Sequence, residues 1–222
     1  PGRKILAITS TNDSAKEMKQ RLHRILRSDS ELNFPVEIEG SSLPFVSTFH
    51  SLGVHILKEN SERLGMPRHF TIFDRNDSKG AVKEAMERRG VDPKRFEPSK
   101  MLSIISREKG NGVSFNEFLD KSADSHMAVI ARSIWEEYEF ILKKEKAYDF
   151  DDLLLKAYEL LKIPEVLETF QNKWSHIHID EYQDTNKVQN KITVLLTEKN
   201  RNICVVGDTD QNIYSWRGAE IK

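Results

Sequence analysis

The sequence has very little cysteine and no long hydrophobic run, and each absence excludes a class of protein. A single cysteine, Cys204, stands among the 222 residues, so a secreted domain held together by internal disulfides is excluded. Its apolar neighbours predict a buried thiol, and a reducing, cytoplasmic compartment suits such a chain. No apolar run approaches the roughly 18 residues that a membrane-spanning helix needs, so no membrane partner is expected.

Net charge is nearly absent as well. The formal net charge is −1, so overall charge gives no support for nucleic-acid binding. Strand-binding grooves depend on local positive charge and aromatic side chains, which acidic surface elsewhere can offset. Hydrophobic residues make up 38% of the chain and charged residues 31%, an ordinary balance for a globular protein. Composition therefore predicts a folded domain and leaves its function open.

Strand-like segments occur near both ends of the chain, and helix-like stretches follow them. Residues 4–9 (KILAIT) form a short apolar run, and the next stretch has apolar side chains at helical spacing, with Asn12 or Asp13 as its N-terminal cap. Strands that alternate with helices predict a parallel sheet covered on both faces. Further strands of this kind are expected within residues 45–51, 175–180 and 203–208.

Between these two regions the pattern changes. From about Asp74 to Trp174 the sequence shows one helix signal after another, several of them ending on glycine. This length is a plausible size for a domain of its own. We therefore expect an α/β domain made of residues 1–73 and 174–222, interrupted by an all-helical insertion of residues 74–173.

Acidic residues follow two of the expected strands. In parallel α/β sheets functional groups collect at the carboxyl ends of the strands, and here one strand delivers Asp180 and then Glu181. The first carboxylate can hold magnesium, which prefers oxygen ligands, and the second can orient and deprotonate an attacking water. The alternative is that both residues simply cap the next helix.

Five segments together resemble the superfamily 1 DNA helicases of the UvrD, PcrA and Rep type. Two of them are long and resemble signature motifs of that family, and the other three are shorter. Their order and spacing agree with the family along essentially the whole chain. The segments are DEYQDTN at 180–186, VVGDTDQNIYSWRGA at 205–219, AITSTNDSAKEM at 7–18, STFHSLGVHIL at 47–57 and DFDDLL at 149–154.

The resemblance implies specific roles at the nucleotide site. Asp180 would bind Mg²⁺ and Glu181 would activate water. Gln211 would contact the γ-phosphate and link it to the DNA site, unless it is only a surface amide in a turn. Arg217 would contact either the nucleotide or the DNA strand. The Asp151 and Asp152 side chains of DFDDLL have capping or packing as an equally good interpretation.

The resemblance also implies a surface for single-stranded DNA. Tyr214 and Trp216 would stack on bases, although Trp216 could instead belong to a core. Ser10 stands where the family usually has an aromatic residue that stacks on a base, so the stacking contact with DNA is absent at this position. Four further residues are candidates for contacts with the DNA backbone: Thr11, Asn12, Thr48 and His50. For His50, Thr11 and Asn12 a structural role is an equal alternative.

The family resemblance implies an incomplete RecA-like α/β domain of the P-loop NTPase type, with an all-helical inserted domain. The parent protein would be a 3′-to-5′ DNA helicase or translocase that uses ATP and Mg²⁺. Its partners would be single-stranded DNA, junctions of single and double strands, and other domains of the same chain, in the cytoplasm at the nucleoid. The 222 residues contain no Gly-Lys-Ser/Thr loop for phosphates, so by themselves they are expected to be inactive.

Two other interpretations stay open. The parent could be the helicase part of a helicase–nuclease, which shares the DEYQDTN motif. It could also be a non-catalytic module that holds DNA or a partner. A phosphate-binding loop upstream in the parent reading frame would favour a motor over the binding module.

Overall fold

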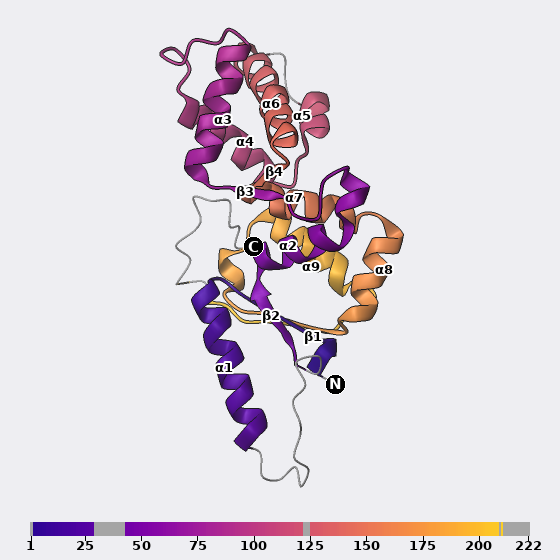
Figure 1. Cartoon of the computed structure of the whole chain (residues 1–222). Helices are drawn as coiled ribbons and strands as arrows, with labels where there is room; N and C mark the ends of the chain where they lie inside the picture. The colour runs from indigo at the N-terminus through magenta and orange to yellow at the C-terminus, as the bar shows by residue number, and fades with distance from the viewer. Residues whose placement is uncertain (1, 29–42, 122–124, 209, 211–222) are drawn as a thin grey trace.

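The computed structural model describes residues 2–28, 43–121, 125–208 and 210, and it contains a parallel sheet with helices (Figure 1). The sheet has four strands in the order β2-β1-β5-β6, and every neighbouring pair is parallel. The expected α/β class with a parallel sheet and many helices is therefore confirmed. The strands are β1 (Ile5–Thr9), β2 (Phe45–Thr48), β5 (His176–Ile179) and β6 (Ile203–Val205).

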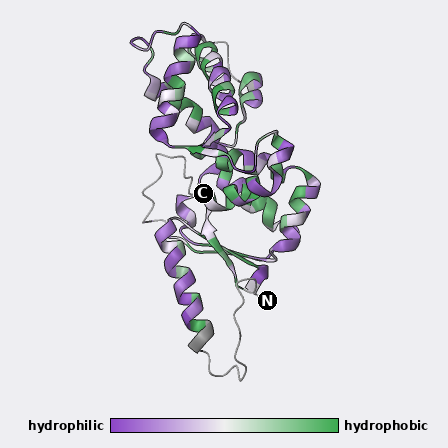
Figure 2. Cartoon of the chain, viewed as in Figure 1, coloured by the Kyte–Doolittle hydropathy of each residue, from purple (hydrophilic) through white to green (hydrophobic). Residues whose placement is uncertain are grey.

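Helices cover the two faces of this sheet unequally. Leu6 and Ile8 of β1 and Ile177 of β5 pack into a large core on one face. Ala7 of β1 points to the other face, where it packs with the first helix, α1, which Figure 2 shows to be largely hydrophilic. The helices of the large core are α2 (Phe49–Asn60), α7 (Phe150–Leu161), α8 (Pro164–Lys173) and α9 (Lys187–Thr197), and α1 is Asn12–Ser28.

Cys204 corrects one expectation from the sequence. Its thiol is exposed, and the other residues of β6 and Val206 beyond it are exposed too. Strand β6 is the outer strand of the sheet in the described part of the chain, and no described helix packs over it. The apolar neighbours of a residue indicate a strand, but they do not show whether anything covers that strand.

A second hydrophobic core lies in the helical part of the chain. Val82, Ile105 and Ile134 meet there with Trp135 and Tyr138, all almost fully buried. A short parallel pair, β3 (Thr71–Phe73) with β4 (Ala147–Asp149), closes this part at the point where the chain enters and leaves it. The helices are α3 (Arg75–Arg88), α4 (Pro98–Gly110), α5 (Phe115–Lys121) and α6 (His126–Lys144); short 3-10 turns elsewhere are η1 (Gly2–Lys4), η3 (Ser61–Leu64) and η4 (Tyr182–Asp184).

The last two helices of the expected insertion, residues 74–173, pack with the sheet. Leu153 and Leu160 of α7 and Phe170 of α8 belong to the core that also holds β1 and β5. Helix α7 lies so close to α2 that a Cβ atom on Gly53 would stand 2.3 Å from the carbonyl oxygen of Leu153. The two domain ranges stay a prediction, and the packing favours an insertion that ends near β4.

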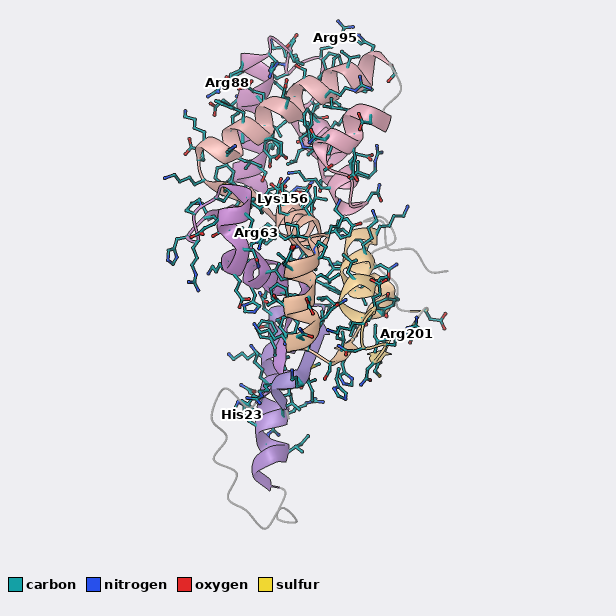
Figure 3. All side chains as sticks on the ribbon, turned by 90° about the vertical axis from the view of Figure 1, so that its right-hand side faces the viewer. His23, Arg63, Arg88, Arg95, Lys156 and Arg201 are labelled. Atoms are coloured by element: carbon teal, nitrogen blue, oxygen red, sulfur yellow. The ribbon has the colours of Figure 1, made fainter. Side chains whose placement is uncertain are left out.

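A buried ionic cluster joins the helical part to α7. The Lys109 side chain, on α4, is fully buried. Its Nζ atom lies 2.9 Å from a carboxylate oxygen of Asp149, 2.8 Å from one of Asp152 and 3.1 Å from one of Glu139. The Tyr138 hydroxyl also donates to Asp149 over 2.8 Å. Lys156, labelled in Figure 3 where the two parts meet, lies close to these acids. The cluster thus connects α4 and α6 with the start of α7.

The pKa values of the two aspartates of this cluster are shifted in opposite directions. Burial acts to raise the pKa of Asp149, but the Lys109 ammonium and several hydrogen bonds outweigh it, so the pKa is lowered and the group is a carboxylate. Burial, and then the neighbouring Asp149, raise the pKa of Asp152 well above its ordinary value. Asp149 and Asp152 also form the capping box of α7, which confirms the capping interpretation for Asp152, while Asp151 accepts a hydrogen bond from Ser106.

This difference predicts unequal effects of two isosteric substitutions. Asp149→Asn removes the charge that Lys109 needs and should lower the free energy of unfolding by about 3 kcal/mol at pH 7. Asp152→Asn replaces a carboxyl that favours its protonated form and should change it by less than about 1 kcal/mol. Urea unfolding of the chain, followed by tryptophan fluorescence, measures both.

The pH dependence provides the control. Because the folded-state pKa of Asp152 is raised, its bound proton stabilises the fold fully below the unfolded value of about 4, and this stability is lost as pH rises through the folded-state value. Asp152→Asn should remove this decline, so its free energy of unfolding should rise relative to that of the wild type as pH rises. An Asp152→Asn protein as unstable as Asp149→Asn would contradict the assignment of charges.

Candidate functional site

The carboxyl ends of the strands bring the candidate residues to one edge of the sheet. Thr9, at the end of β1, pairs in register with Thr48 at the end of β2, and Ile8 pairs with Ile179 of β5. The backbone N–H of Asp180 donates to the carbonyl oxygen of Ile8 over 2.9 Å, so this residue continues the strand. Asp180 therefore leaves the sheet beside the segment that leads into α1.

Asp180 presents an oxygen ligand at this edge. Its side chain is partly buried, and Oδ1 accepts a hydrogen bond of 3.0 Å from the N–H of Glu181. Among the described residues Oδ2 has no hydrogen-bonding partner. A carboxylate with one oxygen anchored and the other available fits Mg²⁺, which binds through one or two carboxylates and keeps several waters.

Glu181 adopts a backbone conformation that is unusual for its residue type. Its φ of 55° and ψ of 42° lie in the left-handed region, where a residue other than glycine is held at a cost of about 1–3 kcal/mol. Its Oε2 atom accepts a hydrogen bond of 2.6 Å from Nε2 of Gln183. Strain of this kind persists only where surrounding contacts hold it, and it is concentrated at functional positions.

The capping alternative for these two acids does not fit the geometry. Helix α9 begins at Lys187, and its cap is Asn186, whose side chain accepts from the N–H of Gln189 in a reciprocal capping box. Neither Asp180 nor Glu181 caps it. The acids precede only the short turn η4, where the Glu181 side chain makes no capping hydrogen bond.

The threonines expected to contact DNA cap their own helices. Thr11 Oγ1 accepts from the N–H of Ser14 over 3.1 Å, so Thr11 is the cap of α1, and the expectation of Asn12 or Asp13 was wrong by one or two residues. Thr48 is buried and its Oγ1 accepts from the N–H of Ser51 over 3.2 Å at the start of α2. Neither geometry tests a DNA contact, so both roles stay predictions.

Asn12 and His50 lie at the same edge of the sheet. Asn12 is exposed in the first turn of α1. His50 is partly buried in the first turn of α2, and its ring meets Phe150 edge to face at a centroid distance of 5.7 Å. Phe150 is itself half-exposed, so the two rings form an aromatic spot beside the start of α7. A structural and a binding role for His50 are both compatible with this contact.

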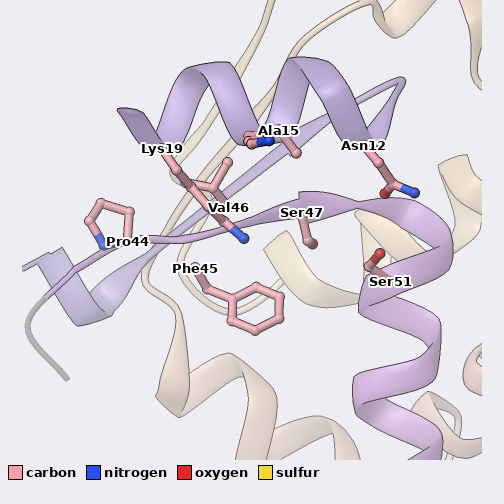
Figure 4. A pocket seen from close by; sticks show the side chains of 9 residues that line it. Asn12, Ala15, Lys19, Pro44, Phe45, Val46, Ser47 and Ser51 are labelled. Atoms are coloured by element: carbon pink, nitrogen blue, oxygen red, sulfur yellow. The ribbon is translucent and has the colours of Figure 1, made fainter. Parts of the chain in front are cut away.

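A hollow of about 490 Å³ opens between α1 and β2 (Figure 4). Lys16 and Lys19 of α1 border it, and Asn12 and Ser51 stand at the end nearest the candidate site. Asp180 and Glu181 do not line it. The hollow therefore extends the carboxyl edge on the DNA-candidate side, away from the two acids.

Several predicted residues lie outside the part of the chain that the structure describes: Gln211, Tyr214, Trp216 and Arg217. The segment that leads toward them is described as far as Asp208, which follows β6. The N–H of Asp208 donates to Oε1 of Gln183 over 3.1 Å. Gln183 is the residue that sequence reasoning missed. It lies inside the DEYQDTN motif, but the motif does not show that this side chain contacts both Glu181 and Asp208.

Two absences concern only the described residues. None of their helices has the length and apolar character needed to cross a membrane. No group of three or more His, Cys, Asp or Glu side chains among them could hold a metal. His176 and His178 of β5 are exposed, and they alternate with Ile177 and Ile179, which are buried in the large core.

Comparison with known proteins shows the family. The family model for the UvrD/REP helicase N-terminal domain matches residues 2–222. The chain is 40% identical over 219 residues to a protein named ATP-dependent DNA helicase PcrA of Staphylococcus aureus (strain Mu50 / ATCC 700699). It is 41% identical over 219 residues to the protein of the same name of Staphylococcus epidermidis (strain ATCC 12228 / FDA PCI 1200).

These alignments cover 98% of the chain but 28% of each relative, so the chain spans less than a third of the length of the curated relatives it matches. The family match extends over both the sheet and the helical part. The chain belongs to the UvrD/REP helicase N-terminal domain family, as its five segments predicted.

Proposed function

We propose that the chain contributes the water-activating carboxylate and a DNA-binding edge to an ATP-dependent 3′-to-5′ DNA helicase. The observation that carries this proposal is the pair Asp180 and Glu181 at the carboxyl end of β5, with Glu181 held in a left-handed conformation by its neighbours. Family membership and relatives named as ATP-dependent DNA helicases support it.

Each acid has a distinct task in ATP hydrolysis. Asp180 would hold Mg²⁺ through its carboxylate, and the ion when bound would neutralise phosphate charge. Glu181 aligns the attacking water and accepts its proton on Oε1, since Oε2 is engaged by Gln183. Gln211, and Arg217 on one of its two interpretations, would complete the phosphate contacts. The phosphate-binding loop would come from other parts of the parent, so these 222 residues alone should not hydrolyse ATP.

The DNA-binding edge would combine backbone contacts with stacking. Asn12 is exposed and His50 is partly exposed at the carboxyl edge. Lys16 and Lys19, which line the same hollow as Asn12, provide local positive charge. Thr11 and Thr48 would add hydroxyls near helix N-termini, and Tyr214 and Trp216 would supply π-faces for bases. The proposed partners are single-stranded DNA, its junctions with duplex DNA, and other domains of the parent chain. The proposed location is the nucleoid.

The assignment of the base predicts the effect of removing it. In the parent protein, Glu181→Gln should lower the kcat of DNA-stimulated ATP hydrolysis by at least about 100-fold, because the amide cannot accept the proton. Binding of ATP and of DNA should change by less than about 3-fold. The matched control is Glu198→Gln, an exposed acid at the end of α9.

Two outcomes would contradict the assignment in different ways. A Glu181→Gln protein that hydrolyses ATP within about 3-fold of the wild type would show that another group is the base. A wild-type parent that binds DNA with no ATP hydrolysis at all would favour the non-catalytic binding module.

The stacking role predicts a fluorescence change. Trp135 and Trp174 have exposures of 0% and 1%, so quenching of the 222-residue chain by single-stranded oligothymidine should come from Trp216. The quenching should weaken with salt and disappear in Trp216→Phe. Circular dichroism verifies that both proteins are folded. Equal quenching in Trp216→Phe, or none in the folded wild type, would remove Trp216 from the DNA site.

A further inference from the structure

The Gln183 side chain bridges the ends of two strands. It belongs to η4, immediately after β5, and only 9% of the residue is exposed. Its Nε2 atom donates to Oε2 of Glu181 over 2.6 Å, and its Oε1 atom accepts from the N–H of Asp208 over 3.1 Å. One amide therefore connects the candidate base with the segment that follows β6.

The chemistry of the two partners determines the orientation of this amide. A carboxylate only accepts hydrogen bonds, and a backbone N–H only donates. The NH₂ group of Gln183 must therefore face Glu181 and its carbonyl oxygen must face Asp208. A hydrogen bond to an ionised acceptor is also stronger than a neutral one, so this contact restrains the Glu181 carboxylate.

The backbone around Gln183 leaves the amide little freedom. A Cβ atom on Gly207 would stand 2.6 Å from Oε1 of Gln183 and 3.3 Å from its backbone nitrogen, so the amide packs directly on a glycine. The N–H of Tyr182 donates to the carbonyl oxygen of Val206 over 2.9 Å, and the N–H of Val206 donates to that of Ile179 over 2.8 Å. These bonds hold η4 against the end of β6.

We propose that Gln183 is a positioning residue that holds the Glu181 carboxylate and couples it to the segment after β6. This inference rests on the proposed function, in which Glu181 activates water. Residues 211–217, in which the family resemblance places phosphate and DNA contacts, begin three positions after Asp208. A displacement of residues 207 and 208 changes the hydrogen bond to Oε1 and, through the rigid amide, the position of Oε2 of Glu181.

The experiment uses the full-length parent with oligothymidine and Mg-ATP. Gln183→Met keeps the length of the side chain and removes both hydrogen bonds. It should lower the kcat of DNA-stimulated hydrolysis by about 10- to 100-fold, because a base displaced by an ångström loses much of its effect. The KM for ATP and the affinity for DNA should stay within about 3-fold of the wild type, because no substrate contact is removed.

A second variant gives a signature that a purely structural role would not produce. Gln183→Glu retains an acceptor for the Asp208 N–H but puts a second carboxylate beside Oε2 of Glu181. Like charges at hydrogen-bond distance raise the pKa of the pair, so the acid limb of the kcat profile should move to higher pH. The activity lost at neutral pH should return in part at alkaline pH.

Gln171→Met is the matched control. Gln171 is as buried as Gln183, at 9%, and its amide donates to the carbonyl oxygen of Leu195 between α8 and α9, away from the acids. It should leave kcat within about 3-fold and the pH profile unchanged. Should Gln183→Met fail to fold, Gly207→Ala tests the same contact from the other side and should also lower kcat, because its methyl group displaces the Gln183 carbonyl.

The outcomes separate this inference from the proposed function. A wild-type parent without ATP hydrolysis, or a Glu181→Gln protein with full activity, overturns the proposed function itself. An active wild type, an inactive Glu181→Gln, and Gln183 variants with kcat within about 3-fold and an unshifted acid limb overturn only the role of Gln183. A reduced kcat with the shifted limb in Gln183→Glu supports it.

Discussion

The parallel pairing of β1 with β5 is the constraint on which the rest of the structure depends. It joins strands from opposite ends of the chain, in a register that puts Ile8 beside Ile179. Because both strands run the same way, the segments that leave them emerge at one edge of the sheet. Across the sheet, that edge receives Thr48 at the end of β2, Thr11 after β1 and Asp180 after β5. In the proposed function the candidate DNA contacts therefore lie on one side of the candidate nucleotide site. A slip of one residue would turn Ile177 and Ile179 out of the core, so the hydrophobic pattern protects the site geometry.

The helical part is attached to α7 and α9, which pack on the sheet, by polar as well as apolar contacts. The β3–β4 pair carries the chain out and back, and Asp149 at its end both caps α7 and accepts hydrogen bonds from Lys109 and Tyr138. A second link runs from Lys191 of α9 to the carbonyl oxygens of Asn111 and Gly112 at the end of α4. Buried ion pairs add little net stability compared with apolar packing, but they are costly to break singly. The cluster is therefore better suited to fixing one orientation of the two parts than to strengthening the fold.

Much of the architecture could be predicted from residues, and the exceptions share a physical cause. Apolar runs ending in acids located β5 and the Asp180–Glu181 pair, and the side chain of Asn186 identified the start of α9. Periodicity shows that a helix buries a face but not against which partner, so α7 and α8 were expected with the helical part although they pack on the sheet. The same limit explains the exposed Cys204 and the buried Lys109. The bridge of Gln183 depends on two strand ends meeting, which only the folded chain creates.

In the proposed function, DNA and nucleotide meet at the carboxyl edge of this sheet. Hydrogen exchange of the parent protein, measured peptide by peptide with and without single-stranded oligothymidine, tests it most directly. Exchange reports the protection of backbone amides, so bound DNA should slow it in peptides covering residues 10–14 and 48–52. Peptides from the opposite edge, such as residues 199–203 before β6, should be unchanged. Protection confined to that opposite edge, or none at the carboxyl edge under saturating DNA, would contradict DNA binding at the carboxyl edge.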